Sequence, residues 1–316
     1  MRNFCMISLF FLSINLSAQK KQDSLSADPP RYFAFKFSIE GKYDSAIYYY
    51  NKELENLSDT SDNYWKYKYK IADCLSKQGK TKKAKQIYLA CFKRIEIEKE
   101  EKNWKLLSRI GEETKSSVAF TFICLQLADI YIAEKKYDSA LYFINWNRLY
   151  WPERQMDGVT EKGTKEMKSG YQYALCFNAK KQIDSAINHL AKYAFYTNES
   201  INRIFDSAQY KKLVNLYFKL LNKKYRASEI RDSFFYAVTN ISFTDKPFTM
   251  FYGEDEKNKW HYVVCYLLFF GNKIELMNWN YPAYQLSEIE KKKYSKEYIL
   301  SDLKNTEIYS LISKLE

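Results

Sequence analysis

Histidine is scarce in this chain, so the residues with types and spacing suited to chemistry are few. The two histidines are His189 and His261, and histidine is the usual general base near neutral pH. Cys265 follows His261 by four residues, a spacing that places both side chains on one face of a strand. Two candidate ligands fall short of a metal site, which usually draws on a larger cluster of His, Cys, Asp or Glu. We predict an exposed or edge position on a helix for His189 and a packing role for His261 with Cys265, with no catalytic residue and no metal.

Other chemical motifs point the same way. The acidic stretch 253–256 is too short and wrongly spaced for a calcium-binding loop. The sequence contains neither a glycine loop for phosphate nor a nucleophile-elbow serine. No Cys-x-x-Cys spacing occurs, and the number of cysteines beyond residue 18 is odd. Cys74 and Cys176 have the pattern of small buried residues. We therefore expect no cofactor and no enzymatic activity.

A short motif recurs along the first two thirds of the chain and ends each time in alanine. Its copies are Tyr43-Asp44-Ser45-Ala46, Thr81-Lys82-Lys83-Ala84, Tyr137-Asp138-Ser139-Ala140 and Ile183-Asp184-Ser185-Ala186. A second alanine stands twelve residues before each of these, at Ala34, Ala72, Ala128 and Ala174. Large apolar residues flank both positions. Small residues at both positions allow two helices to cross closely, so the pattern predicts four pairs of packed helices.

This pattern resembles the tetratricopeptide repeat (TPR), a helix–turn–helix unit, over residues of about 30–195. The resemblance implies a mainly α fold: an array of about four irregular helical hairpins. The copies are spaced more widely than the usual period of about 34 residues. Two insertions, 99–117 and 151–170, account for the difference; we expect a short helix in the first and a mobile surface loop in the second. The alternative is an irregular helical bundle with chance alanine spacing.

The pattern changes after the fourth hairpin. Apolar residues spaced three and four apart from Tyr210 to Leu221 predict an amphipathic helix that ends the array. From about Ser233 the period moves towards two, which predicts strands at 235–243, 248–252, 260–270 and 273–279. Gly271-Asn272 suits a hairpin turn. We expect a small α+β C-terminal domain with an antiparallel meander and two closing helices; buried helices in place of the strands are the alternative.

The N-terminus is typical of a secretory signal peptide. Residues 1–18 hold one positive charge, a short apolar run and small residues at the end; a retained N-terminal anchor is the alternative. No later apolar run approaches the roughly 20 residues of a membrane span. We therefore expect domains at 1–18, 19–225 and 226–316. We also expect a periplasmic or secreted protein of a bacterium of the Gram-negative type, with at most a peripheral attachment to the envelope.

The charge of the chain also constrains its partners. The formal charge is +12, but the lysines are interleaved with glutamate, as on a solvated helix face. Export and the lack of a basic arm argue against nucleic acid. An acidic partner or an anionic lipid surface remains the alternative explanation of the charge.

What remains is protein binding. In the family that the pattern resembles, the first helix of each hairpin lines a concave groove that takes a peptide or an extended segment. The resemblance places eight residues in that groove: Arg31, Lys66, Tyr69, Asp73, Lys77, Asp129, Tyr171 and Asn178. Polar side chains would fix the peptide backbone while tyrosine supplies contact area. In the third hairpin the apolar Phe122, Leu125 and Ile132 take these positions, which suggests an apolar pocket or coverage by the inserted segment.

The function we expect is that of an exported adaptor or scaffold. The alternatives are ordinary solvated helix faces, or a C-terminal domain that binds a ligand or catalyses a reaction while the repeats act as a docking arm.

Overall fold

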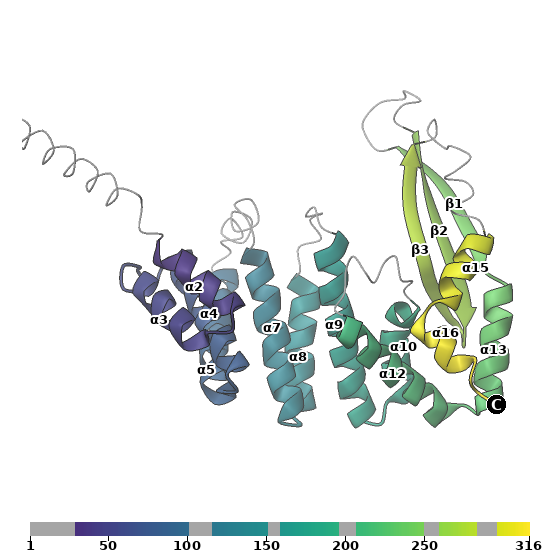
Figure 1. The fold of residues 1–316 in the computed structure, drawn as a ribbon, viewed down its shortest axis with the longest axis horizontal. Helices are drawn as coiled ribbons and strands as arrows, with labels where there is room; N and C mark the ends of the chain where they lie inside the picture. Colours follow the sequence, from purple (N-terminus) through teal and green to yellow (C-terminus); the bar gives the residue numbers. More distant parts are fainter. Residues whose placement is uncertain (1–28, 101–115, 151–158, 196–206, 250–258, 283–295) are drawn as a thin grey trace, which may run out of the picture. The chain divides into compact units, whose positions relative to one another are not determined.

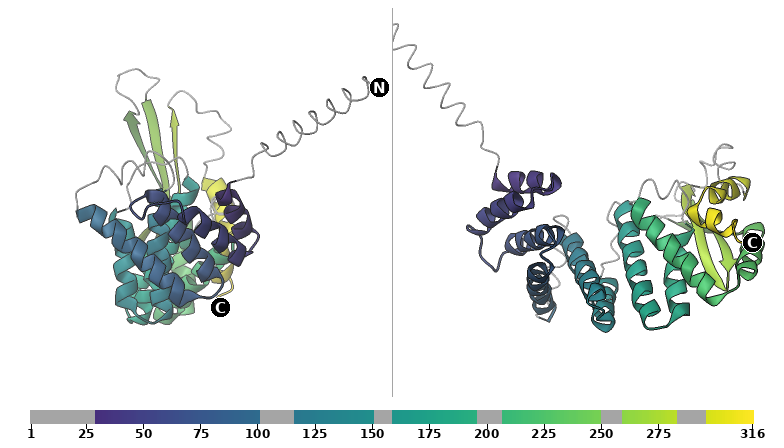
Figure 2. Two further views of the ribbon diagram at one scale, coloured as in Figure 1. Left: turned by 90° about the vertical axis from the view of Figure 1, so that its left-hand side faces the viewer. Right: turned by 60° about the horizontal axis from the view of Figure 1, so that its bottom comes forward.

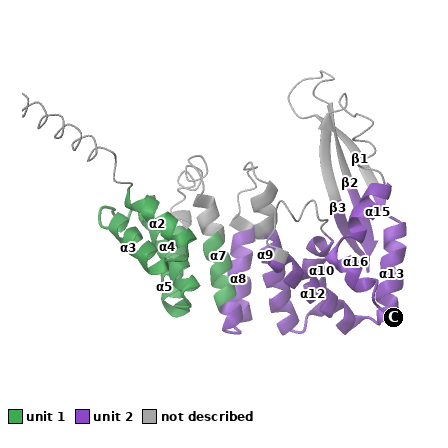
Figure 3. Cartoon of the chain, in the orientation of Figure 1, with its two compact units in different colours: residues 1–130 green, residues 131–316 purple. Residues whose placement is uncertain are grey.

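A computed structural model describes residues 29–100, 116–150, 159–195, 207–249, 259–282 and 296–316. The fold is mainly helical with a small antiparallel sheet near the C-terminus, as the sequence predicts. The chain divides into two compact units, residues 1–130 and 131–316 (Figure 3), and each is described by itself. The expected signal peptide, residues 1–18, lies outside the described residues.

The first unit is built of consecutive helices that pack in sequence order (Figure 1). They are α2 (Pro30–Ile39), α3 (Tyr43–Leu54), α4 (Asp62–Lys77) and α5 (Thr81–Glu100), followed by α7 (Ser116–Ala133), in which the division between the units falls. Contacts join α2 to α3, α3 to α4 and α4 to α5.

Local sequence explains where these helices begin. Pro30 occupies the first turn of α2, where its missing N–H costs no hydrogen bond. The Ser61 hydroxyl accepts a hydrogen bond of 3.2 Å from the Tyr64 N–H and so caps α4. The apolar faces of α2, α3 and α4 then share a small core formed by Ala34, Ala46, Tyr50, Ile71 and Cys74.

The same backbone turn closes the first helix of all four predicted hairpins. An N–H three residues beyond the helix end donates to a carbonyl five residues earlier: Lys42 to Phe37, Lys80 to Leu75, Lys136 to Tyr131 and Gln182 to Phe177, at 2.8–2.9 Å. The residue before each donor has a positive φ. This geometry is a Schellman turn, which satisfies carbonyls that the helix leaves unpaired. The recurring motif therefore corresponds to a recurring turn.

The second unit continues with helices and then forms the sheet. Its helices are α8 (Tyr137–Tyr150), α9 (Val159–Ala179), α10 (Ile183–Ala194), α12 (Ser207–Lys224), α13 (Ala227–Thr239), α15 (Lys296–Lys304) and α16 (Glu307–Ile312). Contacts join α8 to α9, α9 to α10 and α10 to α12. The amphipathic helix expected from Tyr210 to Leu221 is α12, whose buried residues include both of these.

The sheet has the order β1-β2-β3 and is antiparallel throughout, so the predicted meander is confirmed. Its strands are β1 (Ser242–Thr249), β2 (Lys259–Phe269) and β3 (Asn272–Pro282). Cys265, Leu267 and Phe269 are buried while Leu268 is exposed. This alternation places one face of the sheet on the helices.

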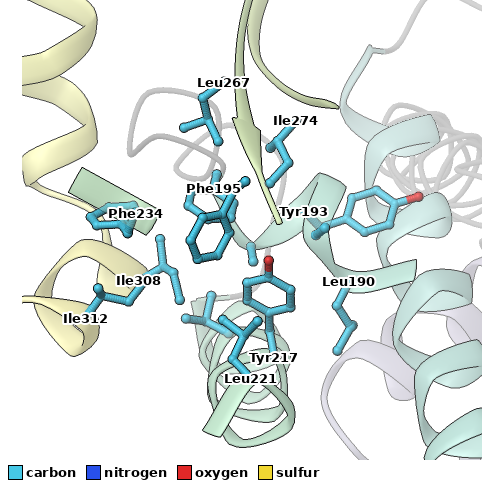
Figure 4. Close-up of a cluster of buried hydrophobic side chains, with 14 of the residues drawn as sticks. Leu190, Tyr193, Phe195, Tyr217, Leu221, Phe234, Leu267, Ile274, Ile308 and Ile312 are labelled. Carbon is cyan, nitrogen blue, oxygen red and sulfur yellow. The ribbon is translucent and has the colours of Figure 1, made fainter. Parts of the chain in front are cut away.

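A hydrophobic core joins helices α9, α10, α12, α13, α15 and α16 to that sheet face (Figure 4). Figure 4 shows Phe195 between Phe234 and Tyr217, and its ring lies within 6.0 Å of those of Tyr217, Phe234 and Phe269. Helices α15 and α16, yellow in Figures 1 and 2, lie beside the sheet and contribute Ile299 and Ile312. The domain boundary expected between 225 and 226 therefore lies inside the second unit, between helices that share one core.

Four local predictions were wrong. A separate strand was expected at 248–252, but Phe248 and Thr249 end β1, which runs without a break from Ser242; residues 250–252 lie outside the described residues. Residues 159–170, expected in a mobile loop, form the first half of α9, because Gly170 is a packing position and not a helix breaker. Residues 235–239, expected in a strand, end α13, whose buried residues Ile230, Phe234 and Ala237 have helical spacing. The tight turn lies at Phe270-Gly271, one residue earlier than predicted. Both turn residues have positive φ, which suits a two-residue hairpin.

The predicted burial of small residues is confirmed. All eight alanines of the pattern are 0% exposed. The cysteines within the described residues are free and buried: Cys74, Cys91, Cys124, Cys176 and Cys265. The part of the first insertion between 101 and 115 lies outside the described residues.

Candidate functional site

One face of α4 gathers four of the charged side chains of the first unit. Lys66, Lys70, Asp73 and Lys77 are spaced four, three and four residues apart, which aligns them along a helix. Lys66 and Lys77 are exposed, whereas Lys70 and Asp73 are half-buried. We call these four residues the α4 charged face. Lys70 was not among the predicted groove residues. Its position two residues before Ala72 is the sequence signal that could have identified it.

Charges on this face are only partly paired. The Lys77 ammonium lies 3.0 Å from a carboxylate oxygen of Asp73 and 5.9 Å from the ring centroid of Tyr43. Burial lowers the pKa of Lys70; Asp73 opposes this effect, while Lys66 and Lys77 lower the pKa further. Three lysines thus stand against one aspartate, and an additional negative charge would stabilise the face.

Tyr69 does not supply exposed contact area as expected. It is 7% exposed, and its ring centroid lies 6.4 Å from that of the buried Tyr88. Burial raises the pKa of the Tyr69 phenol, and the charge of Asp73 raises it further. Position 69 lies between the α4 charged face and the side of α4 that packs on α5. The Tyr69 side chain takes the second side, where it packs near Tyr88. Tyr69 is a core residue.

Arg31 lies at the start of α2 and is exposed. Its backbone N–H donates a hydrogen bond of 2.8 Å to the Glu53 carboxylate at the end of α3. Burial and then the Glu53 charge raise the pKa of Tyr67, while Arg31 lowers it. Arg31 therefore stands near Glu53 of the first hairpin and Tyr67 of the second, and it is exposed.

The other predicted groove residues are placed as follows. Asp129 on α7 is half-buried and belongs to the first unit. Tyr171 packs at the edge of the second unit's core, and Asn178 is half-buried near the end of α9. Leu125, one of the apolar residues of the third hairpin, is fully buried and so cannot line an open pocket.

His189 occupies an aromatic stack and not a reactive site. Its ring centroid lies 4.4 Å from that of Tyr173 and 5.3 Å from that of Phe177, with nearly parallel planes. Burial lowers the pKa of His189, and the nearby Arg148 lowers it further. The Tyr173 hydroxyl contacts the Asn145 side-chain oxygen at 2.5 Å. His189 was expected to be an exposed or edge histidine; it is half-buried in this stack. The side chain of His261, for which packing was predicted, lies outside the described residues.

None of the described cysteines is an activated nucleophile. Burial raises the pKa of Cys91 and of Cys265 to about 12 and that of Cys176 to about 11, so these thiols stay protonated near neutral pH. Over the described ranges, no group of three or more His, Cys, Asp or Glu side chains is arranged to hold a metal ion.

Comparisons with protein-family models, with curated proteins and with solved structures find no match for this chain. None of the helices that the structure describes combines the length and the apolar composition required to cross a bilayer. Function must therefore be argued from the surfaces themselves.

Proposed function

We propose that the protein is an exported adaptor whose TPR-like hairpins bind a segment of another protein along their first helices. The α4 charged face carries this proposal. It holds more positive than negative charge, and its outer lysines are exposed while their neighbours are partly desolvated. Charged hydrogen-bonding groups of this kind orient a bound segment and determine its specificity.

The recurring turn supports a repeat of the TPR type. The four first helices end in the same Schellman geometry, and each hairpin has a buried alanine on both helices. Contacts between consecutive helices, such as α3 with α4 and α10 with α12, are those that stacked hairpins would make. The leader-like residues 1–18 support export.

The choice of binding residues is narrower than the sequence alone suggests. Tyr69 is withdrawn from the groove because it is buried. Lys66, Asp73 and Lys77 remain, and Lys70 joins them on the same face of α4. Arg31 contributes from the start of α2. The described cysteines are buried, and no described group of His, Cys, Asp or Glu is arranged to hold a metal ion; the non-enzymatic role remains a prediction.

Charge reversal on the α4 charged face tests the proposal. Purified wild-type chain and the double variant Lys66→Glu/Lys77→Glu would each be used to capture partners from the native envelope fraction. The matched control is Lys82→Glu/Lys83→Glu, which makes the same charge change at exposed positions of α5 in the same unit. We expect a partner that the wild type and the α5 control retain and the α4 variant loses. Equal recovery by all three proteins would exclude this face as the contact.

A further inference from the structure

An exposed apolar strip runs along α2. Tyr32, Phe35 and Ile39 are 48%, 57% and 69% exposed, and their spacing of three and four residues places them on one helix face. We call these three residues the α2 apolar face. Single exposed apolar residues are ordinary, but an aligned group on one helix is typical of an interaction surface.

The three residues of this face occupy the same positions in α2 as three residues of the α4 charged face occupy in α4. Tyr32, Phe35 and Ile39 stand two before, one after and five after Ala34. Counted from Ala72, those positions in α4 are Lys70, Asp73 and Lys77. The two alanines are equivalent members of the recurring pattern, and both are fully buried. Equivalent positions therefore carry large apolar side chains in the first hairpin and charges in the second.

Helices α2 and α4, which carry the two faces, contact each other within the first unit. The Ser38 hydroxyl of α2 lies 3.8 Å from the Cys74 sulfur of α4, and Ala34 and Ile71 belong to the same small core. Lys77 also reaches the ring of Tyr43, just beyond the end of α2. An extended segment crossing one face would therefore continue onto the other.

We propose that the α2 apolar face and the α4 charged face form one binding surface for a partner segment in which large apolar side chains stand beside an acidic side chain. This inference rests on the proposed function and specifies the chemistry of the partner. Apolar side chains of the segment cover Phe35 and Ile39. Its carboxylate lies beside Lys66 and Lys70, where one aspartate faces three lysines. Charge complementarity thus favours an acidic segment over a basic one.

Peptide selection tests both parts of the surface separately. The probe is a display library of random 12-residue peptides, selected on the purified wild-type chain and on two variants, Phe35→Ser/Ile39→Ser and Lys66→Glu/Lys77→Glu. The control is Leu268→Ser, which removes an exposed apolar side chain in the second unit. Circular dichroism checks that each variant is folded, and Ile39→Lys provides a second, single-site variant of the α2 apolar face.

We expect the wild type to enrich peptides that combine an aromatic or large aliphatic residue with Asp or Glu. For the best peptide, measured by fluorescence polarisation, both double variants should bind at least about tenfold more weakly, as for loss of an interface hot spot. Leu268→Ser should bind as the wild type does. Selection on Phe35→Ser/Ile39→Ser should keep the acidic preference and lose the apolar one.

Failure of this inference and failure of the proposed function give different results. Enriched peptides that lack apolar residues, or that bind the α2 variants with wild-type affinity, overturn this inference and leave the proposed function intact. No enrichment on the wild type contradicts the proposed function itself. Sedimentation velocity tests a second copy of the chain as the occupant: a wild-type dimer that becomes monomeric in Phe35→Ser/Ile39→Ser also overturns the inference.

Discussion

The ring of Tyr193 lies directly over Gly170. A Cβ built on Gly170 would stand 2.5 Å from Cε2 of that ring and 3.0 Å from the carbonyl oxygen of His189. Helices α9 and α10 therefore approach closely at a residue without a side chain. The glycine that suggests a loop in the sequence is what lets two helices of the second unit pack.

Gly170→Ala should destabilise the second unit by about 1–3 kcal/mol, the usual cost of overpacking, although the same change at an open helix position is favourable by about 0.5–1 kcal/mol. Urea unfolding measures the difference. Tyr193→Leu should relieve the clash, so the double variant should be more stable than the sum of the single changes predicts. Strict additivity would show that the ring and the new methyl group do not compete.

Two of the four hairpin turns hold lysine in a left-handed conformation. Lys135 has φ 58° and Lys181 has φ 60°, where the first two turns have Gly41 and Gly79. Lys135→Gly and Lys181→Gly should each stabilise the protein by about 0.5–1 kcal/mol, because glycine adopts this φ without strain. Gly41→Ala should instead destabilise the protein. Thermal unfolding checks all three, and a destabilising lysine-to-glycine change would contradict the strain argument.

Protonation of His189 should destabilise the fold. Because burial and Arg148 lower the folded-state pKa of His189 below its ordinary 6.5, the unfolded chain binds the proton more readily. Stability is therefore complete above about pH 6.5 and falls as the pH drops from there to the lower folded-state pKa. His189→Phe keeps an aromatic ring beside Tyr173 and Phe177 and should remove this slope. The measurement is the free energy of unfolding of both proteins between pH 5 and 7.5; parallel curves would contradict the prediction.

A series of ion pairs links the start of a hairpin's second helix to a lysine at or just beyond the C-terminal end of a later helix. Lys80 lies 3.5 Å from Asp44, Lys180 pairs with Asp138, and Lys224 pairs with Asp184. A double-mutant cycle of Asp184→Asn and Lys224→Gln should give a coupling of about 0.2–1 kcal/mol, as for other exposed pairs. The coupling should fall in 1 M salt. Coupling that does not respond to salt would point to packing of the side chains instead.

Loss of Phe269 should affect helices as well as the sheet. Phe269 is fully buried on β2, with its ring centroid 5.7 Å from that of Phe195 and 5.9 Å from that of Phe234. Phe269→Ala should cost about 3–5 kcal/mol. Hydrogen exchange should show lost protection in α10 and α12 while α3 and α4 are unchanged. Loss confined to residues beyond 225 would instead favour a separately folding C-terminal domain.

Features that depend on neighbouring residues in the chain were predictable. The recurring alanines identified the buried positions, and the cysteines beside them were correctly expected to be buried and free. The limits of α2, α4 and α12 follow from proline, serine and apolar spacing, which act within one or two helical turns. The order of the strands followed from short connections.

The tertiary structure decided the rest, because the environment of a side chain is set by residues far away in sequence. Tyr69 and Phe35 are both aromatic residues within three positions of a buried alanine, Ala72 and Ala34. Tyr69 packs on α5 and is buried, whereas Phe35 lies on α2 with no helix over it in the described part of the first unit and stays exposed. Likewise, Gly170 became a helix contact only because Tyr193 reaches it from α10. Sequence alone determined which residues recur; the packing of the helices decided which of them meet solvent.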